Sequence, residues 1–367
     1  MRKCKLSECV KEINDRTIEN NQYEVLTSSK NGIFSQEEYF DKQVASKDNT
    51  GYKIIKNGQF TYRSMSDSGT FTINRLEDKN IGIVSPAYPV FEATNVDAEF
   101  LKYYFKSELF NKAIINLSQG STRTALKYKD LIDIEIYLPE IEEQKRIVKI
   151  LKNSDQIIEK YDELIKEKEQ FIKSQFVEMF GNPNVNNKEL EIVKLKDICE
   201  NLDNQRIPVT STNRTSGKYP YYGASGIVDY VNDYIFDEDL LLVSEDGANL
   251  IARVTPIAFS ITGKAWVNNH AHVLRFKNKC TQIYVENFFE NLNINQYITG
   301  ITQPKLNQER LNSIEIPIPD IESQEKYMGI KKLIDKQKFN YINKVKLLKE
   351  IINIFLGGKK IWTKKYQ

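Results

Sequence analysis

Apolar residues recur every seven positions in two long stretches of the chain. The later stretch has Tyr327, Ile334, Tyr341, Leu348 and Phe355, and the earlier one has Ile150, Ile157, Leu164 and Phe171. Lysine and glutamate fill the positions between them, and this sustained spacing predicts a helix with a seam that packs against another helix. An ordinary amphipathic surface helix is the alternative, but two matching stretches favour a coiled coil in which each helix is the other's partner.

Both predicted helices carry signals at their ends. Pro139 and Pro319 stand where a helix can begin, and the acidic residues after them suit the positive end of a helix dipole. Gly181-Asn-Pro183 closes the first helix, and Gly357-Gly358 closes the second. A helix over residues 141–180 would be about 60 Å long at about 1.5 Å per residue. Two such helices packed antiparallel would form a rod with a globular part at each end.

An internal repeat organises the chain. The segment from Gly120 to Gln144 returns as the segment from Gly300 to Gln324, at a constant offset of 180 residues (300 − 120 and 324 − 144). Both copies have a Gly-x-Thr loop, then Ile-Glu-Ile-x-x-Pro, an acidic residue and Ile-Glu-x-Gln. A weaker sequence similarity relates residues 5–10 to residues 194–199. The chain therefore contains two copies of one plan, a globular segment followed by a long helix.

Short β-rich runs separated by Gly, Asn, Asp and Pro clusters fill both globular segments. Residues 81–85, 240–244 and 272–276 are examples, whereas residues 98–110 and 285–292 have the spacing of short amphipathic helices. We expect an α+β fold with two globular α/β domains joined by two long antiparallel helices that form a coiled coil. The expected boundaries are 1–139 for the first globular domain, 140–182 for the first long helix, 183–318 for the second globular domain, 319–358 for the second long helix and 359–367 for a C-terminal tail.

Composition limits the classes of protein to consider. Hydrophobic residues make up 40% of the 367 residues, which is enough to build cores. The net charge is only +2, so any positively charged surface has to be local. The cysteines, Cys4, Cys9, Cys199 and Cys280, show no zinc spacing, and no apolar stretch suits a signal peptide or a membrane helix. We therefore expect free thiols in a reducing cytoplasm.

The motifs of enzymes that act on DNA are missing. The catalytic loop of an amino-methylating enzyme needs a Pro-Pro pair, which the chain lacks, and Thr262-Gly-Lys-Ala265 has neither the first glycine nor the hydroxyl of a phosphate-binding loop. The acidic residues after Pro139 and Pro319 resemble a nuclease pattern, but they lie in the first turn of a helix, where acidic side chains are expected. The sequence therefore predicts a non-catalytic chain that binds no metal or cofactor itself.

The histidines are His270 and His272 alone. On a strand, residues i and i+2 face the same side, so a metal-binding pair is conceivable, but no third ligand has a suitable spacing nearby. Polar groups that contact DNA or pack at its edge are the favoured interpretation.

Several loops concentrate the side chains that bind DNA. Base edges are read by Arg, Lys, Asn and Gln, and phosphates are contacted by Lys, Arg, Ser, Thr, Tyr and backbone amides. In the first globular segment the candidates are Tyr62, Arg63, Ser64, Gln119, Gly120, Ser121, Thr122 and Arg123. In the second they are Lys218, Tyr221, Tyr222, Gly223, Lys264, Asn268, Asn269, His270, Gly300, Thr302, Gln303 and Lys305. The loops at Gly120 and Gly300 are favoured, because they share one repeat position.

Together these features resemble the DNA specificity subunit of type I restriction-modification systems. The resemblance covers nearly the whole chain: both Gly-x-Thr loops, both proline-containing helix entries and both long helices. Residues 83–88, 219–226 and 262–267 also resemble segments of that family's target recognition domains. The two globular domains would then be such target recognition domains.

The resemblance implies that each domain reads one half of a split double-stranded DNA site. The helices would set the gap, about one helical turn or roughly 34 Å, and dock two modification subunits that use S-adenosylmethionine to methylate a flipped adenine. Restriction (motor-nuclease) subunits that use ATP and Mg would join if they are present. Because Gln303-Pro-Lys305 replaces Arg123-Thr-Ala125, the two domains are expected to read different sequences, which makes the site asymmetric.

Two other classes of function remain open on the sequence alone. One is a stand-alone metal-dependent DNA endonuclease, and the other is a coiled-coil scaffold that binds only proteins. A subunit that serves a methylation-only system is a variation within the favoured class, and the sequence does not separate it.

Overall fold

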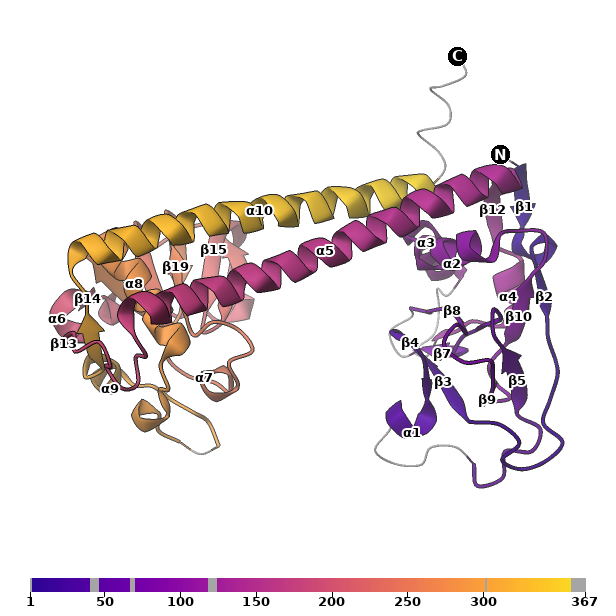
Figure 1. Cartoon of the computed structure of the whole chain (residues 1–367), viewed down its shortest axis with the longest axis horizontal. Coiled ribbons are helices and arrows are strands. Elements are labelled where there is room, and N and C mark those ends of the chain that lie inside the picture. The colour runs from indigo at the N-terminus through magenta and orange to yellow at the C-terminus, as the bar shows by residue number, and fades with distance from the viewer. Residues whose placement is uncertain (1, 40–45, 67–69, 118–123, 301, 358–367) are drawn as a thin grey trace, which may run out of the picture. The chain divides into compact units, whose positions relative to one another are not determined.

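The computed structural model describes residues 2–39, 46–66, 70–117, 124–300 and 302–357, which fall into two compact units (Figure 1). Unit 1 comprises Met1–Tyr161 and Ile342–Gln367, and unit 2 comprises Asp162–Tyr341. The division crosses both long helices, α5 (Ile141–Phe180) and α10 (Ile321–Gly357). Each unit therefore consists of a globular domain and about half of each long helix.

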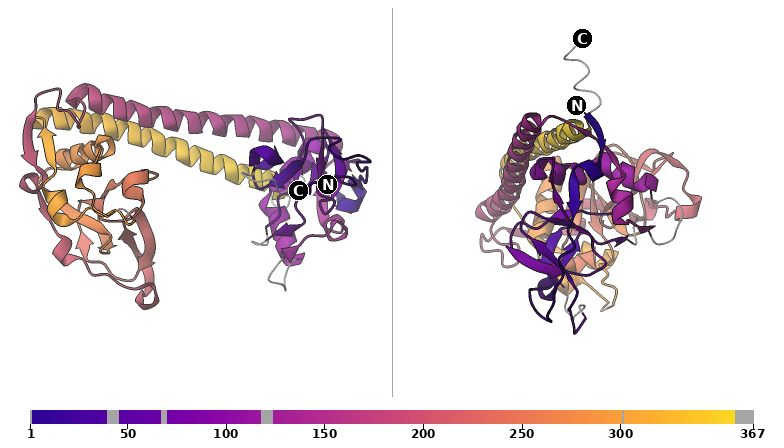
Figure 2. Two further views of the ribbon diagram at one scale, coloured as in Figure 1. Left: turned by 90° about the horizontal axis from the view of Figure 1, so that it is seen from below. Right: turned by 90° about the vertical axis from the view of Figure 1, so that its right-hand side faces the viewer.

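The long helices pair in antiparallel fashion in unit 2, as predicted. Nζ of Lys338 on α10 lies 2.8 Å from Oε1 of Glu169 on α5, and the ring centroid of Tyr327 on α10 lies 5.6 Å from that of Phe176 on α5. In unit 1 the helices also meet, because Nζ of Lys344 lies 5.6 Å from the ring centroid of Tyr161. Later residues of α10 in unit 2 thus face earlier residues of α5, and the two ribbons run side by side in this unit (Figures 1 and 2).

The seam of α10 uses the predicted positions. Tyr327 and Ile334 are buried, and Tyr341 and Leu348 are half-buried. The side chain of Phe355 lies outside the described residues. The seven-residue spacing therefore identifies the face of α10 that packs inward.

The predicted seam of α5 is wrong by one position. Ile150, Ile157 and Phe171 are 41%, 43% and 46% exposed, whereas Leu151 and Ile172 are 0% and 9% exposed. Large apolar residues occupy adjacent positions at 150/151, 157/158, 164/165 and 171/172, so two sets repeat every seven residues. Spacing alone could not decide which set faces the partner helix, and the structure buries the second.

The globular domain of unit 1 consists of small antiparallel sheets with short helices packed against them. Its strands are β1 (Arg2–Lys5), β2 (Val10–Glu12), β3 (Leu26–Ser29), β4 (Gly32–Ser35), β5 (Lys53–Lys56), β6 (Phe60–Thr61), β7 (Met65–Ser66), β8 (Asn74–Arg75), β9 (Ile81–Val84), β10 (Val90–Ala93), β11 (Thr124–Ala125) and β12 (Glu135–Leu138). Its helices are η1 (Leu6–Glu8), α1 (Gln36–Tyr39), α2 (Ala98–Lys106), α3 (Glu108–Leu117) and α4 (Tyr128–Ile132). The central sheet has the order β2-β10-β6-β8, and β1–β12, β3–β4, β5–β9 and β7–β11 form pairs.

The globular domain of unit 2 contains two four-stranded sheets, with orders β14-β21-β18-β19 and β16-β15-β20-β17, and the pair β13–β22. Its strands are β13 (Glu191–Lys194), β14 (Cys199–Asn201), β15 (Ser216–Gly223), β16 (Gly226–Val231), β17 (Phe236–Asp237), β18 (Leu240–Ser244), β19 (Ala258–Ile261), β20 (Lys264–Val267), β21 (Ala271–Phe276) and β22 (Glu315–Ile318). Its helices are α6 (Leu195–Ile198), η2 (Asp203–Gln205), η3 (Ser211–Asn213), α7 (Asn249–Ala252), α8 (Lys279–Asn291), η4 (Asn295–Tyr297) and α9 (Gln308–Asn312).

The repeated glutamine of the sequence motif locks the start of each long helix. Gln144 and Gln324 are only 1% and 3% exposed. The side-chain amide of Gln144 donates to the carbonyl of Pro139 (2.8 Å), and that of Gln324 donates to the carbonyl of Pro319 (2.7 Å). These bonds fix the turn between the last strand of each domain and the helix that follows it, so the most visible repeat in the sequence has a structural role.

All cysteines are free, as predicted. Burial raises the pKa of Cys199 to about 12, and burial together with the neighbouring Cys4 raises that of Cys9 to about 12. Neither thiol is therefore a nucleophile at neutral pH. In the described part of the chain, no helix has the length and apolar content that a membrane span requires.

Candidate nucleic-acid interface

Hydrogen bonds join separate turns of unit 2 into one surface. The backbone N–H of Asn268, after β20, donates to the carbonyl of Tyr222 on β15 (3.0 Å). The turn at residues 245–247, after β18, donates to the carbonyls of His270 (2.9 Å) and Pro304 (3.0 Å). We call the predicted contact residues that these bonds bring together the loop cluster: Gly223, Asn268, Asn269, His270, Gly300, Thr302, Gln303 and Lys305.

The loop at residues 299–305 is closed at its base. Thr299 and Lys305 exchange backbone hydrogen bonds of 2.8 and 2.7 Å. Gly300 has a φ of +81°, and a Cβ there would lie 2.4 Å from the carbonyl oxygen of Gln303, so this position requires glycine. Thr302 and Gln303 are exposed. The loop thus offers polar side chains that can reach base edges in a groove.

A network of charged side chains connects the core of unit 2 with this loop. Nδ1 of His272 lies 2.6 Å from the carboxylate of Asp203, and Nη1 of Arg206 lies 2.7 Å from that of Glu245. Nζ of Lys305 lies 3.1 Å from Glu245. The side chains of His272 and Asp203 are 1% and 5% exposed, whereas that of Lys305 is 50% exposed. The network therefore runs from β21 to the surface.

Both ring nitrogens of His272 face acceptors. Nε2 lies 2.7 Å from the carbonyl oxygen of Leu306, which can only accept, so Nε2 carries a proton. Burial raises the pKa of the Asp203 carboxyl, but hydrogen bonds from His272 and from the N–H of Val273, with nearby positive charge, outweigh burial and hold the pKa below its ordinary value. Asp203 is therefore ionised at neutral pH, and its carboxylate lies within hydrogen-bond distance of Nδ1 of His272.

Asp203, Glu245 and His272 also have the composition of a metal site, with ligand atoms within 4.8 Å of one another. Their hydrogen bonds argue against metal binding. Both nitrogens of the His272 ring are already engaged, by Asp203 and Leu306, and the guanidinium of Arg206 already supplies a cation to the Glu245 carboxylate. We assign the group as an ion-pair network. The two carboxylates lie far from His272 in the sequence, so ligand spacing could not have revealed it.

The two histidines do not share one face of a strand. His270 precedes β21, its side chain is 50% exposed, and Nδ1 lies 2.9 Å from the carboxylate of Asp246. His272 lies within β21 and is buried. The i, i+2 argument for a metal-binding pair therefore fails, because only His272 belongs to the strand.

Lys218 and Lys264 lie at the opposite ends of β15 and β20 from the loop cluster. Nζ of Lys264 lies 4.3 Å from the ring centroid of Tyr234, and hydrogen bonding to Tyr234 raises the pKa of Lys264. Nζ of Lys218 lies 5.2 Å from the ring centroid of Tyr219. Exposed cations held over aromatic rings suit contacts with phosphates. The role of Tyr234 could not be predicted from the sequence, because this residue is distant in the chain from Lys264.

In unit 1, Arg63 lines a groove of about 630 Å³. Lys30, Gln36 and Thr72 line the same groove, and Ser64, which precedes β7, is half-buried. Sequence reasoning selected Arg63 but missed the others, because they come from segments separated along the chain. The groove combines a guanidinium, an ammonium and an amide, which are the groups that bind phosphates and base edges.

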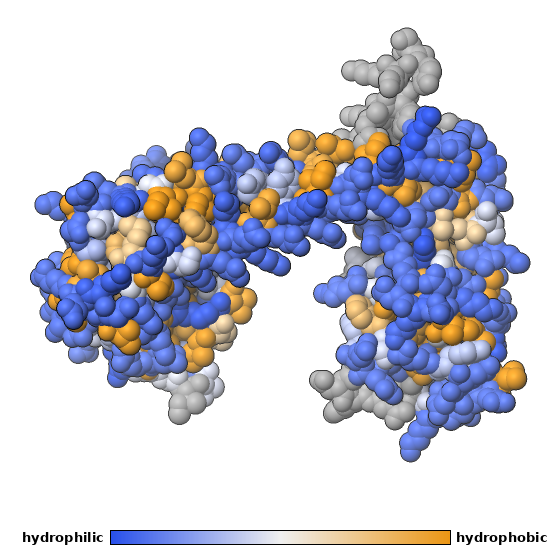
Figure 3. All heavy atoms as spheres, in the orientation of Figure 1, coloured by the Kyte–Doolittle hydropathy of each residue, from blue (hydrophilic) through white to orange (hydrophobic). Residues whose placement is uncertain are grey.

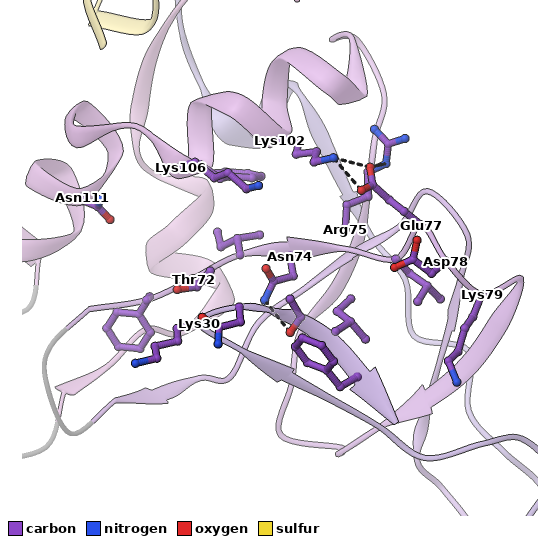
Figure 4. A pocket seen from close by; sticks show the side chains of 18 residues that line it. Lys30, Thr72, Asn74, Arg75, Glu77, Asp78, Lys79, Lys102, Lys106 and Asn111 are labelled. Carbon is purple, nitrogen blue, oxygen red and sulfur yellow. Dashed lines mark hydrogen bonds and ion pairs between the residues drawn. The ribbon is translucent and has the colours of Figure 1, made fainter. Parts of the chain in front are cut away.

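A second groove of unit 1, of about 480 Å³, adjoins the first (Figure 4). Lys30 and Thr72 line both grooves. Lys102 on α2 is neutralised by Glu77, at 2.7 Å. Among the residues that the structure describes, Lys30 and Lys106 form no ion pair, so both ammonium groups are available for phosphates.

Tyr62 and Tyr221 were predicted as DNA contacts, but the structure buries both rings, at 0% and 1% exposed. The hydroxyl of Tyr62 donates to the carbonyl of Leu126 (3.1 Å), and the hydroxyl of Tyr221 accepts from the N–H of Val209 (3.0 Å). Both hydroxyls thus hold neighbouring backbone. Polar residue type in a loop-like segment could not reveal that these rings belong to the core.

The remaining predicted residues divide into three groups. Tyr222 is half-buried against Phe259, and Asn268 is 7% exposed, with Oδ1 accepting from the N–H of His270 (2.8 Å). Asn269 is exposed in the loop cluster. Gln119, Gly120, Ser121, Thr122 and Arg123 lie outside the described residues. DNA contact stays a prediction for all of these positions.

Each unit combines an α+β domain, whose loops carry exposed polar side chains, with about half of each long helix. The family model of the type I restriction modification DNA specificity domain matches residues 8–170 and again residues 187–353. The chain therefore belongs to the family of type I restriction-modification specificity subunits, the non-catalytic DNA-recognition components of these systems.

Relatives of known assignment agree with the family model. A protein of Haemophilus influenzae assigned as a type I restriction enzyme specificity subunit is 34% identical over 142 residues, which cover 39% of this chain and 36% of that protein. The type I restriction enzyme MjaIX specificity subunit of Methanocaldococcus jannaschii is 26% identical over 296 residues, which cover 71% of this chain and 68% of that subunit.

Solved structures share the fold over the whole chain. The S subunit of a type I restriction-modification system from M. genitalium has a TM-score of 0.53 at 17% identity, covering 97% of this chain and 94% of that one. A chain from a structural study of complex assembly and conformational transition of the type I R-M system has a TM-score of 0.62 at 16% identity, covering 97% and 96%. At these identities the likeness concerns the fold.

Proposed function

We propose that the chain reads a bipartite, asymmetric DNA site, with each unit reading one half. The observation that carries the proposal is that the two units repeat one plan but present different chemistry. Unit 2 offers the loop cluster with Thr302 and Gln303, whereas unit 1 offers grooves lined by Arg63, Lys30 and Lys106. Different donors and acceptors select different base edges, so two unlike half-sites follow.

The long helices would set the gap between the half-sites and dock two modification subunits. Apolar side chains that neither helix buries support the docking role: Leu333 and Phe339 on α10 are 66% and 63% exposed, and Ile157 and Phe171 on α5 are 43% and 46% exposed. Figure 3 shows apolar surface interrupting the hydrophilic surface of the helices. Exposed apolar groups of this kind mark protein interfaces.

The chemistry of methylation and cleavage would belong to the partners. Modification subunits would bind S-adenosylmethionine and methylate an adenine in each half-site, and restriction subunits, where present, would use ATP and Mg. This chain would contribute sequence selection and geometry. The proposal thus assigns recognition and catalysis to different chains of one complex.

Mapping methylated adenines tests the proposed function. The genome of a host that carries this chain and its modification subunits is compared with the genome of the same host lacking this chain. We expect methylation at one motif made of two unlike half-sites separated by a fixed gap. Methylation that is independent of this chain, or a motif with a single uninterrupted half, would contradict the proposal.

Substitution of an exposed groove residue of unit 1 or of an exposed residue of the loop cluster is expected to weaken DNA binding. Arg63→Ala and Gln303→Ala should each cost about 1–3 kcal/mol of affinity if the side chain reads a base. If Arg63 contacts a phosphate instead, the slope of log K against log salt should fall by about one. Arg2→Ala, an exposed arginine on β1, is the matched control. Fluorescence anisotropy at several salt concentrations measures both effects, and variants that bind like Arg2→Ala would contradict the assignment.

Charged substitutions on the exposed face of α10 are expected to block assembly. Leu333→Glu with Phe339→Glu should weaken binding of the modification subunit about ten-fold or more, because the interface loses apolar contact and gains buried charge. The stability of the chain itself should change by less than about 0.5 kcal/mol per exposed site. Lys332→Glu is the control for added negative charge. Light scattering after size exclusion reports the complex, and normal assembly of the double variant would exclude this surface.

A further inference from the structure

A leucine at the same repeat position is hydrogen-bonded to an equivalent segment in both units. Leu126 of unit 1 and Leu306 of unit 2 occupy one repeat position and are 2% and 0% exposed. The N–H of Leu126 donates to the carbonyl of Ser64 (3.0 Å), and the N–H of Leu306 donates to that of Glu245 (2.8 Å). Immediately before each leucine the backbone pairs with the residues that follow Ser64 or Glu245. The two attachments are equivalent.

Different side chains hold the carbonyl groups of these leucines. In unit 1 the hydroxyl of Tyr62 donates to the carbonyl of Leu126, at 3.1 Å. In unit 2 Nε2 of His272 donates to the carbonyl of Leu306, at 2.7 Å. Both donors are 0% exposed. A buried side chain therefore makes the same bond in each unit, from Tyr62 directly after β6 and from His272 on β21, although the residue type differs.

The two donors occupy different positions of the repeated plan: Tyr62 directly follows β6, and His272 lies on β21. Strands β6 and β10 of unit 1 correspond in register to β18 and β21 of unit 2. Tyr62 then corresponds to Val243, and His272 corresponds to Pro89. Val243 and His272 are direct cross-strand partners. Valine and proline side chains carry no donor. The donor therefore occupies different positions in the two units, whereas the acceptor is the carbonyl of the same repeated leucine in both.

We propose that Tyr62 and His272 are positioning residues for DNA reading, each fixing the backbone segment that its unit presents to DNA. The inference rests on the proposed function. In unit 2 the segment is the closed loop at residues 299–305, with Thr302 and Gln303 exposed. In unit 1 it is the β7–β11 pair, which follows Arg63. A segment fixed before binding loses little freedom on binding, so the anchor contributes to discrimination without touching DNA.

Both ring nitrogens of His272 take part in this anchor. Nε2 bonds the carbonyl of Leu306 on one side, and Nδ1 lies 2.6 Å from the ionised Asp203 carboxylate on the other. Arg206, Glu245 and Lys305 continue the network to the loop itself. The loop in unit 2 is thus held by its backbone at Leu306 and by the Lys305 side chain.

Matched substitutions separate the anchor from general stability. His272→Leu removes the donor to Leu306, whereas His272→Gln retains an N–H donor of similar reach. Tyr62→Phe removes only the hydroxyl. The controls lose a hydroxyl bond elsewhere in the same unit: Tyr103→Phe loses a half-buried bond to Asp155 in unit 1, and Tyr284→Phe loses a buried bond to the carbonyl of Pro317 in unit 2.

Amide hydrogen exchange tests the anchor on the full chain without DNA. In His272→Leu, which also leaves the Asp203 carboxylate without this partner, exchange should increase about ten-fold more in residues 299, 300 and 302–306 than in β18 and β21. His272→Gln and Tyr284→Phe should resemble the unsubstituted chain in these residues. Unchanged exchange in the His272→Leu loop, or an equal increase throughout unit 2, would overturn the positioning role.

Binding of the complex with modification subunits tests the consequence. The duplex carries the motif found by methylation mapping, and either half is replaced in turn. Tyr62→Phe and His272→Leu should each lower discrimination for one half by about ten-fold, and the two halves should differ. Full discrimination in both variants would overturn the inference. If the unsubstituted complex shows no sequence preference, the proposed function fails and DNA positioning fails with it, while the exchange result still reports whether the anchor exists.

Discussion

Phe176→Ala is expected to destabilise unit 2 by about 3–5 kcal/mol, because it removes a large side chain from a closed aromatic cluster. Phe176 on α5 is 1% exposed. Its ring centroid lies 5.2 Å from that of Phe180, 5.3 Å from that of Tyr284 on α8 and 5.6 Å from that of Tyr327 on α10. The cluster joins both long helices to the globular domain, so the cavity would loosen all three helices.

Phe171→Ala is the matched control on the same helix. Phe171 is 46% exposed and belongs to the heptad that the sequence suggested as the seam. Its replacement should cost less than about 1 kcal/mol. Urea unfolding followed by Trp266 fluorescence, in a Trp362→Phe background, measures both variants. Equal losses of unfolding free energy at the two positions, or a larger loss at Phe171, would contradict the burial of Phe176 and the exposure of Phe171.

The long helices could be predicted from the sequence because their signals are local. The proline and glycine ends and the seven-residue spacing locate α5 and α10 to within a few residues. The face of α5 could not be predicted, because Ile150 and Leu151 begin two overlapping heptads with equal spacing. The choice depends on where the partner helix and the domains lie, which is tertiary information.

The residues of the candidate interface depend on tertiary information even more than the face of α5 does. Residue type and repeat position identified Thr302 and Gln303, which are exposed in a closed loop. They also selected Tyr62 and Tyr221, whose rings are core residues. The groove residues Lys30 and Lys106 and the network around His272 depend on segments far apart in the chain, and nothing in the local sequence marks them.

Asp203→Ala is expected to cost unit 2 about 3–5 kcal/mol, because it leaves buried positive charge without its partner. The carboxylate of Asp203 is 5% exposed, lies 2.6 Å from Nδ1 of His272 and accepts the N–H of Val273 at 2.9 Å. Asp203→Asn should lose less, because its amide can still accept from the N–H of Val273 and keep a hydrogen bond to the His272 ring. Unfolding in urea at neutral pH compares the two variants.

The same network gives stability a defined pH dependence. Burial raises the pKa of the Glu245 carboxyl, but Arg206, His272 and Lys305 outweigh burial, and the pKa is lowered, as for Asp203. Carboxyls with lowered pKa values in the folded state stabilise it when ionised. Their contribution is complete above their ordinary pKa values of 4.5 and 3.8 and is lost as pH falls through the lowered values. Unit 2 should therefore lose stability on acidification from about pH 5 towards pH 3.

Removing one carboxyl should flatten this dependence. In Asp203→Ala the free energy of unfolding should fall less steeply between about pH 5 and pH 3, because one of the groups that take up a proton on unfolding is gone. Asp233→Asn removes an exposed carboxyl of the same unit and should leave both the stability and its slope unchanged. Urea unfolding at several pH values measures the free energy of unfolding of both variants and of the unsubstituted chain. Parallel curves for Asp203→Ala and the unsubstituted chain would show that the buried network does not carry the acid sensitivity of unit 2.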